Sequence, residues 1–323
     1  MPETFCAAES LLNKEPIIGN GLDYRLYFLI EVAPPWSPNE FESKSIPENL
    51  RSLVEGMTNE DEDPEVQFLL IYNRELASGL TRLIIYEREL GLSKGYLKQE
   101  LNFILLEDIA PFVINYLAKN DRDKELQTSE TRDILVCTHG SQDICCARYG
   151  NPFFKDALAV VSELGLSEVR VWQVSHIGGH RFAPTAIAFP DGRYYGRLDR
   201  DSLRAILTRS GDLDLLKRVY RGWAILPQPA QILEVELISI HGWDWFNYKV
   251  DSPIINGNED GSFNDVEITY EVPNGDRYKY RAEVVVDASQ TIYLKGSCDS
   301  QDLYPFPTYE VRNMHQIDLV AGG

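Results

Sequence analysis

The chain of 323 residues is 44% hydrophobic and 25% charged, which is typical of a globular protein with two or three domains. Its formal net charge of −19 argues against nucleic-acid binding, because that function requires a basic surface. The acidic N-terminal segment is unlike a secretory signal, and no apolar run approaches the roughly 18 residues of a membrane span. We therefore expect a cytoplasmic protein with no membrane partner.

The N-terminal third alternates between strand and helix patterns. Helices are predicted at residues 47–57 and 109–119, an acidic turn at 59–64 and a polar linker at 121–131. Near-continuous aliphatic and aromatic runs, typical of strands buried on both faces, cover residues 24–32, 66–72 and 80–87. These patterns predict an α/β domain over residues 1–125.

The middle third is predicted to follow the order strand, loop, helix, strand, loop, hairpin, helix. A strand over 133–137 is followed by a loop over 138–150. Asn151 and Pro152 are typical of a helix start. The later elements are a strand at 169–175, a hairpin formed by 185–189 and 194–198, and a helix at 201–209. This order predicts a thioredoxin-like domain over 126–245.

The last third begins with residues 229–240, for which a helix is favoured over an apolar strand, and then changes to strand patterns. Alternating residues predict a hairpin formed by 265–272 and 277–286, with a further strand at 292–294. We assign 246–323 to a C-terminal β-hairpin extension. The predicted fold class is therefore α/β: two thioredoxin-like α/β domains, the second carrying the candidate site, plus a small C-terminal β-rich extension.

Two short segments hold most of the residues that could perform chemistry. Cys137 and Cys146 lie in Cys-Thr-His-Gly-Ser-Gln-Asp-Ile-Cys-Cys, and His176 and His180 lie in His-Ile-Gly-Gly-His. Two thiols and two imidazoles can bind zinc or an iron–sulfur cluster. Five cysteines in so long a chain argue against a disulfide scaffold and favour metal or redox chemistry.

The spacing within each pair bears on what the site binds. Eight residues separate Cys137 from Cys146, more than the two to four of a zinc knuckle, and this spacing suits a loop around a larger group such as a 2Fe-2S cluster. Gly178 and Gly179 permit backbone angles that would let both histidines face one metal atom. The residues alone leave a cluster, a zinc ion and a metal-free site open.

Neighbouring residues have simpler expected roles. We expect His139 to fix its loop by hydrogen bonding and Asp143 to cap a loop. Cys6 and Cys145 are expected to be buried structural residues, with Cys145 as an alternative ligand to Cys146, and Trp172 is expected in the core.

Basic residues near the site have two interpretations. Arg148 and Arg181 either hydrogen-bond near the site or form surface pairs. Residues 169–221 contain ten Lys or Arg against five Asp, a net of +5. These charges are either scattered solvated arginines or a docking face for an acidic partner.

The motif Cys137-Thr-His-Gly-x-x-Asp-x-x-Cys146, followed by His176-x-Gly-Gly-His180-Arg-Phe, resembles the sucrase/ferredoxin-like family of thioredoxin-like ferredoxins. Cys6-Ala-Ala-Glu-Ser and the segment 28–36 resemble the N-terminal part of that family. The resemblance extends to about residue 240. It implies a 2Fe-2S cluster with Cys137, Cys146, His176 and His180 as its ligands, and the Asp-x-x-Cys spacing selects Cys146 over Cys145.

These observations predict an iron–sulfur electron-transfer or redox protein rather than an enzyme, although the family name implies sucrase activity. Histidine ligation predicts a reduction potential above that of plant-type ferredoxins. No dinucleotide or phosphate-binding motif is present, so an external electron donor and acceptor are required, such as a flavin- or NADPH-linked reductase. Two alternatives remain: a zinc-stabilised binding module without redox activity, and a thiol enzyme using Cys137 or Cys146.

Overall fold

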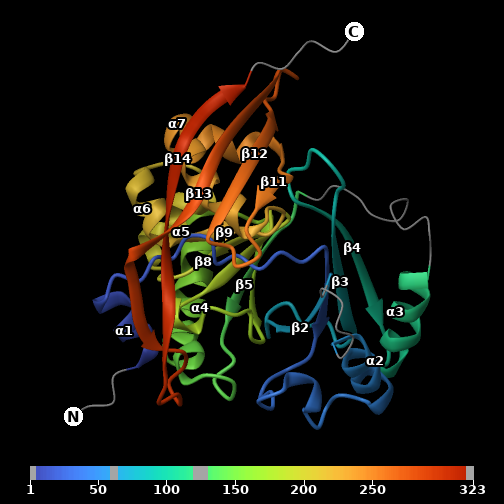
Figure 1. Cartoon of the computed structure of the whole chain (residues 1–323). Helices are drawn as coiled ribbons and strands as arrows, with labels where there is room; N and C mark the ends of the chain where they lie inside the picture. Colours follow the sequence, from blue (N-terminus) through green and yellow to red (C-terminus); the bar gives the residue numbers. More distant parts are fainter. Residues whose placement is uncertain (1–4, 59–64, 119–129, 318–323) are drawn as a thin grey trace.

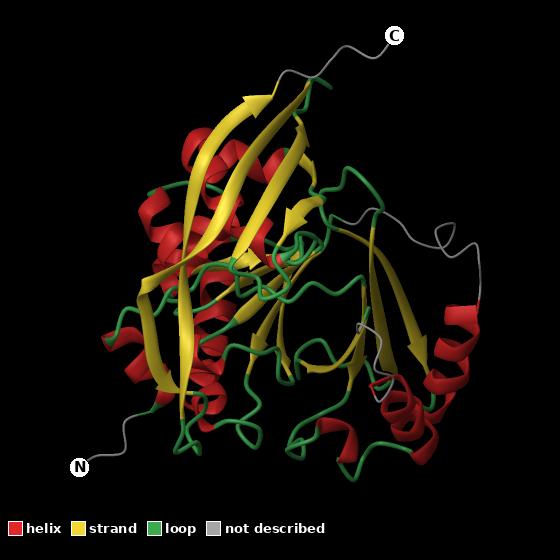
Figure 2. Ribbon diagram, in the orientation of Figure 1, coloured by secondary structure: helices red, strands yellow, loops and turns green. Residues whose placement is uncertain are grey.

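The computed structural model describes residues 5–58, 65–118 and 130–317 (Figure 1). The described residues form a mixed α/β protein with one large sheet and a second, antiparallel sheet (Figure 2). The acidic turn predicted at 59–64 and most of the linker predicted at 121–131 lie outside the described residues. Among the described helices, none combines the length and apolar character that crossing a bilayer requires.

The N-terminal part supplies four strands of the large sheet, and the three predicted strands are confirmed. The strands are β1 (Leu26–Glu31), β2 (Val66–Tyr72), β3 (Thr81–Arg88) and β4 (Tyr96–Phe103). The helices are α1 (Cys6–Leu12), α2 (Glu48–Thr58) and α3 (Ile109–Ala118), with short 3-10 turns η1 (Glu40–Glu42) and η2 (Leu106–Asp108). Every residue of β1 is buried, which accounts for its continuous apolar sequence. Side chains of α2 and α3 cover one face of these strands.

The middle part supplies five more strands, and the predicted strands, hairpin and second helix are confirmed. The strands are β5 (Arg132–Cys137), β6 (Val169–Val174), β7 (Ala186–Phe189), β8 (Arg193–Tyr195) and β9 (Tyr220–Trp223). The helices are α4 (Ile144–Leu164), η4 (His180–Phe182), α5 (Arg200–Thr208) and α6 (Leu213–Val219). β5 and β6 are parallel neighbours, so their C-terminal ends meet at one edge of the sheet.

Both parts contribute to one sheet, in the order β4-β3-β1-β2-β6-β5-β7-β8-β9 within the described residues. The join is an antiparallel pairing of β2 with β6, in which Ile71 faces Val174. The sheet curls strongly. The evidence is that Lys98 of β4 donates to Asp133 of β5 at 2.8 Å, although four strands separate β4 from β5 in the sheet. One apolar core includes side chains from both halves of the sheet, among them Tyr27 and Ile84 from the first half and Ile134 and Ile187 from the second. The predicted pair of α/β units therefore forms one continuous sheet.

The loop predicted at 138–150 is wrong over its second half, because α4 begins at Ile144. Asp143 is the N-cap, and its carboxylate accepts the Cys145 backbone N–H at 2.8 Å. The helix continues through Pro152, which forgoes one backbone hydrogen bond, and ends at Gly165 with φ 66°. Cys146 therefore lies in the first turn of a helix rather than in a loop.

The C-terminal part contains the predicted helix and hairpin, followed by a long strand that the sequence patterns did not indicate. The elements are α7 (Gln228–His241), η5 (Gly242–Asn247), β10 (Lys249–Asp251), β11 (Ile254–Gly257), β12 (Phe263–Glu271), β13 (Arg277–Lys295) and β14 (Leu303–Ile317). The strand predicted at 292–294 is part of β13. The antiparallel sheet packs on α7, and the turn between β13 and β14 reaches α1 at the other end of the molecule (Figure 1).

Candidate metal centre

Three of the four predicted ligands converge at the edge of the sheet where β5 and β6 end. Cys137 is the last residue of β5, His176 follows β6, and Cys146 lies in the first turn of α4. Their donor atoms all lie within 4.8 Å of one another, and Cys146 Sγ is 3.6 Å from His176 Nδ1. The two cysteines are almost completely buried. This arrangement can hold a single metal ion or one side of a small cluster.

Gly150 makes the convergence of the two cysteines possible. A Cβ atom at this position would lie 1.9 Å from the Cys137 carbonyl oxygen, far inside van der Waals contact. Only a residue without a side chain lets α4 pass this close to the end of β5. The close approach brings Cys146, one turn earlier on the same helix, to Cys137.

His180 lies beside these three residues but is held differently. Its ring centroid is 5.7 Å from that of His176. Its Nδ1 lies 3.1 Å from Asp143 Oδ2 and 3.3 Å from Cys6 Sγ. A carboxylate that accepts one ring N–H commonly orients a histidine whose other nitrogen binds metal. Asp143 therefore has two roles, as the N-cap of α4 and as a partner of His180.

The local charges favour a thiolate at Cys137. The hydrogen bond from the Cys146 thiol lowers the pKa of Cys137 well below its usual value, against the effect of burial, and His176 adds to the decrease. The hydrogen bond with Cys137 and burial raise the pKa of Cys146. Burial lowers the pKa of His176, but its hydrogen bond to Cys137 outweighs this and raises the pKa overall. Cys137 is therefore the sulfur that the site favours as a thiolate, the form in which cysteine binds metals.

Arg221 is a site residue that the sequence analysis missed. Its side chain is buried, and its guanidinium donates to the Gly178 carbonyl at 3.2 Å and to the Asn20 carbonyl at 2.6 Å. Burial lowers its pKa to about 10, so it stays charged at neutral pH, and it interacts electrostatically with Cys137 and Cys146. A Cβ at Gly179 would lie 2.4 Å from the guanidinium carbon. The paired glycines in the sequence signal such a close neighbour without identifying it.

The simpler roles expected of His139 and Trp172 are confirmed, whereas Asp143 caps helix α4 rather than a loop. His139 Nδ1 accepts the backbone N–H of His176 at 3.2 Å, so its Nε2 carries the proton and donates to the Ser37 carbonyl at 2.7 Å. The imidazole thus ties the loop after β5 to the segment that carries His176. Trp172 is fully buried in the core.

The basic residues near the site are largely neutralised by acids. Arg181 is buried and pairs with Glu15 at 2.7 Å, whereas exposed Arg148 lies over the ring of Phe5. Further arginines of the segment 169–221 form ion pairs, among them Arg170 with Asp133, Arg193 with Glu234 and Arg209 with Asp191. These pairs favour scattered, structurally bound arginines over a docking face for an acidic partner.

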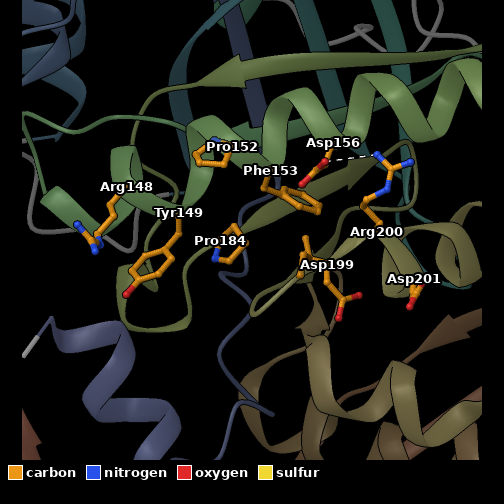
Figure 3. A pocket seen from close by; sticks show the side chains of 10 residues that line it. Arg148, Tyr149, Pro152, Phe153, Asp156, Pro184, Asp199, Arg200 and Asp201 are labelled. Carbon is orange, nitrogen blue, oxygen red and sulfur yellow. Dashed lines mark hydrogen bonds and ion pairs between the residues drawn. The ribbon is translucent and has the colours of Figure 1, made fainter.

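A cavity of about 530 Å³ opens between α4 and the start of α5 (Figure 3). An ion pair between Asp156 and Arg200, 3.3 Å apart, forms part of its lining. Its lining residues are Arg148, Tyr149, Pro152, Phe153, Asp156, Pro184, Leu198, Asp199, Arg200 and Asp201. The lining has no thiol and no imidazole, so this cavity offers no substrate position for a cysteine nucleophile at Cys137 or Cys146.

The fold and the site define an α/β protein with a buried cysteine–histidine centre at one edge of its large sheet. Residues 17–222 match the model of the sucrase/ferredoxin-like family, a region that includes all four predicted ligands. The match covers more than half of the chain, and the chain belongs to this family. The predicted membership of this family is thereby confirmed, and the matched region excludes the segment around Cys6.

Relatives named Altered inheritance of mitochondria protein 32 are similar over shorter regions. The protein from Meyerozyma guilliermondii is 24% identical over 144 residues, 36% of this chain and 51% of the relative. Those from Debaryomyces hansenii and Clavispora lusitaniae are 32% and 31% identical over 96 and 93 residues, in each case 28% of this chain and 34% of the relative. The chain thus spans about half or less of the relatives' length. No solved structure matches the chain.

Proposed function

We propose that this protein is an iron–sulfur electron-transfer or redox protein whose 2Fe-2S cluster is bound by Cys137, Cys146, His176 and His180. The observation that carries the proposal is the convergence of three of these donors within 4.8 Å at one sheet edge, with the His180 ring 5.7 Å from that of His176. Membership of a family with a ferredoxin-like name supports it.

The donor set fits such a group chemically. Cys137 and Cys146 supply soft sulfur ligands from a buried position, and Arg221 contributes a buried positive charge that offsets their negative charge. When bound, the cluster would supply a one-electron couple, and two neutral imidazoles in place of thiolates would raise its potential. His180 retains 18% side-chain exposure, so the histidine side is where we propose that a redox partner approaches.

The wider setting of this function is also a proposal. We propose that the two halves of the large sheet are thioredoxin-like units over residues 1–125 and 126–245, with 246–323 as an extension. An external donor, such as a flavin- or NADPH-linked reductase, would supply the electron, and an acceptor would remove it. The cytoplasm is the proposed location.

A single zinc ion is the second candidate. Three donor atoms within 4.8 Å of one another suit one tetrahedral ion, with His180 as the fourth ligand after a small movement. This alternative would make the protein a zinc-stabilised binding module without redox activity.

The test is an absorption spectrum of protein purified without oxygen, with iron, sulfide and zinc measured on the same sample. We expect visible absorption with iron and sulfide in equal amounts, and a loss of at least about tenfold in bound iron for Cys137→Ser and for His176→Ala, because each removes a ligand. The matched control is His315→Ala, which replaces an exposed histidine of β14 and should leave the iron content unchanged.

Two results would contradict the proposal. Colourless protein with one zinc that is lost in the Cys137→Ser variant would establish the zinc module. Metal-free protein in which iodoacetamide modifies Cys137 or Cys146 would favour the thiol enzyme.

A further inference from the structure

Three cysteines that the proposed function does not use converge at one point of the molecule. Cys6 begins α1, Cys145 lies in the first turn of α4, and Cys298 lies in the turn between β13 and β14. Cys6 Sγ is 3.4 Å from Cys145 Sγ, Cys145 Sγ is 3.3 Å from Cys298 Sγ, and Cys298 Sγ is 3.4 Å from Cys6 Sγ. Residues from both ends and the middle of the chain thus place three sulfurs in a nearly equilateral triangle.

This triangle differs from a disulfide and from ordinary packing of thiols. All three cysteines are free, and a disulfide would consume two and leave the third without a partner. The separations approach those of thiolates that share one ion, since Zn–S bonds of about 2.3 Å in a tetrahedron place sulfurs roughly 3.8 Å apart. Three uncoordinated thiols brought this close would gain little from one another, because S–H is a weak donor and sulfur a weak acceptor.

A fourth donor completes the group. Asp143 Oδ1 lies 3.8 Å from Cys298 Sγ, and one carboxylate oxygen and the three sulfurs all lie within 4.8 Å of one another. The Asp143 carboxylate is buried, and so are Cys6 and Cys145. Three sulfurs and one carboxylate oxygen form a tetrahedral ligand set that zinc accepts.

We propose that Cys6, Cys145, Cys298 and Asp143 bind one zinc ion, at a site separate from the Cys137, Cys146, His176 and His180 set. The sulfurs are too close together to ligate different irons of a cluster, so a single ion is the occupant that fits. Zinc is favoured over copper(I) or iron because a tetrahedral, thiolate-rich set with one carboxylate oxygen suits it best.

His180 connects the proposed zinc site to the first site. Its Nδ1 lies 3.1 Å from the Asp143 carboxylate and 3.3 Å from Cys6 Sγ, so a hydrogen bond from its ring orients Asp143 from outside the ligand set. The zinc ion would also fasten α1 and the β13–β14 turn to α4. Arg181 supports the same junction, since its guanidinium donates to the Lys295 carbonyl and pairs with Glu15. The zinc proposal stands on these residues and does not require the proposed function.

The test measures zinc and visible absorption together on the full chain. We expect one zinc per chain, at least about tenfold less in Cys298→Ser and in Cys6→Ser, and visible absorption within about 20% of wild type in both. Cys137→Ser is the matched control, which should lose the visible absorption and keep this zinc. Cys298 is only partly buried, so its replacement by serine should leave the rest of the fold in place.

A second measurement needs no variant. Wild-type protein stripped of zinc by a chelator and titrated with Co²⁺ should develop the visible bands of tetrahedral cobalt–thiolate coordination, saturating at one added ion for this site. Three results would overturn the proposal: full zinc content in both serine variants, loss of the iron-dependent absorption in those variants, or wild-type protein that binds neither zinc nor Co²⁺ while all three thiols react with iodoacetamide. If the site at Cys137 binds a second zinc ion instead of a cluster, Cys137→Ser and Cys298→Ser should each lose one of two zinc ions. Failure of the cluster proposal is then distinguished from failure of the zinc proposal.

Discussion

Gly150→Ala is expected to remove most of the bound iron and to lower the free energy of unfolding by about 3 kcal/mol, the upper end of the range for overpacked sites. The added methyl group would lie 1.9 Å from the Cys137 carbonyl oxygen. Gly150 belongs to α4 and Cys137 to β5, so neither backbone can move freely to relieve the clash. The start of α4 must therefore move away from the end of β5, which separates Cys146 from Cys137. Iron analysis and urea unfolding of the variant measure the two effects.

Gly56→Ala is the matched control for this substitution. Gly56 is an exposed glycine inside α2, and a Cβ there has nothing within 4 Å. We expect unchanged iron content and a stabilisation of about 0.5–1 kcal/mol, since alanine is the better helix residue. Full iron content in the Gly150→Ala protein would show that the contact between α4 and β5 does not position the two cysteines.

Asp133→Asn is expected to lower the free energy of unfolding by about 3–5 kcal/mol, the range for removing one partner of a buried ion pair. The carboxylate is fully buried and accepts from Lys98 at 2.8 Å, Arg170 at 2.8 Å and the Trp172 indole at 2.7 Å, with the Tyr86 hydroxyl as a fourth donor. The neutral amide of asparagine would no longer balance the positive charges of Lys98 and Arg170. Its NH₂ group would also donate a hydrogen bond where a carboxylate oxygen accepts one. Urea unfolding at neutral pH measures the change.

The pH dependence of this variant tests the same charge. Burial raises the pKa of Asp133, but hydrogen bonds and charges from Arg170 and Lys98 outweigh this and hold it below the ordinary value of 3.8. A lowered carboxyl pKa stabilises the fold above pH 3.8, and that stability is lost as the pH falls through the lowered value. Wild type should therefore lose more stability than Asp133→Asn in strong acid, and the difference between them should shrink.

Asp156→Asn serves as the control for the charge change. Asp156 pairs with Arg200 in the lining of the open cavity, and both side chains are more than 40% exposed. Its replacement should cost less than about 1 kcal/mol. Equal effects of Asp133→Asn and Asp156→Asn would contradict the account of Asp133 as the buried link between the two halves of the sheet.

The parts of the site that the sequence predicts are those set by local pattern. β5 and β6 are short apolar segments. β5 ends on Cys137 and His176 lies two residues after the end of β6, so both candidate ligands could be placed at strand ends. Parallel neighbours end at the same sheet edge, which explains why these two residues meet. The sequence predicts too late a start for α4 because Asn151 and Pro152 are a strong local start signal. The true cap, Asp143, lies in a segment with little helical apolar pattern.

The rest of the site depends on contacts between distant segments. Cys6 and Cys298 are 292 positions apart and meet only because the turn between β13 and β14 reaches α1. Arg221 belongs to no recognisable sequence motif. Its role arises because its side chain is buried against Gly178 and Gly179. The single curled sheet likewise depends on the pairing of β2 with β6, which consists of two residue pairs. No local sequence pattern predicts this pairing.

The most direct test of the central claim is pulsed EPR of the reduced protein, produced with ¹⁵N-labelled histidine. If Cys137, Cys146, His176 and His180 bind a 2Fe-2S cluster, the spectrum will show hyperfine coupling to two histidine nitrogens, and His180→Ala will abolish one of the two or the whole signal. A reduced iron–sulfur signal with no histidine coupling, or a protein with no paramagnetic iron in any redox state, would contradict the account.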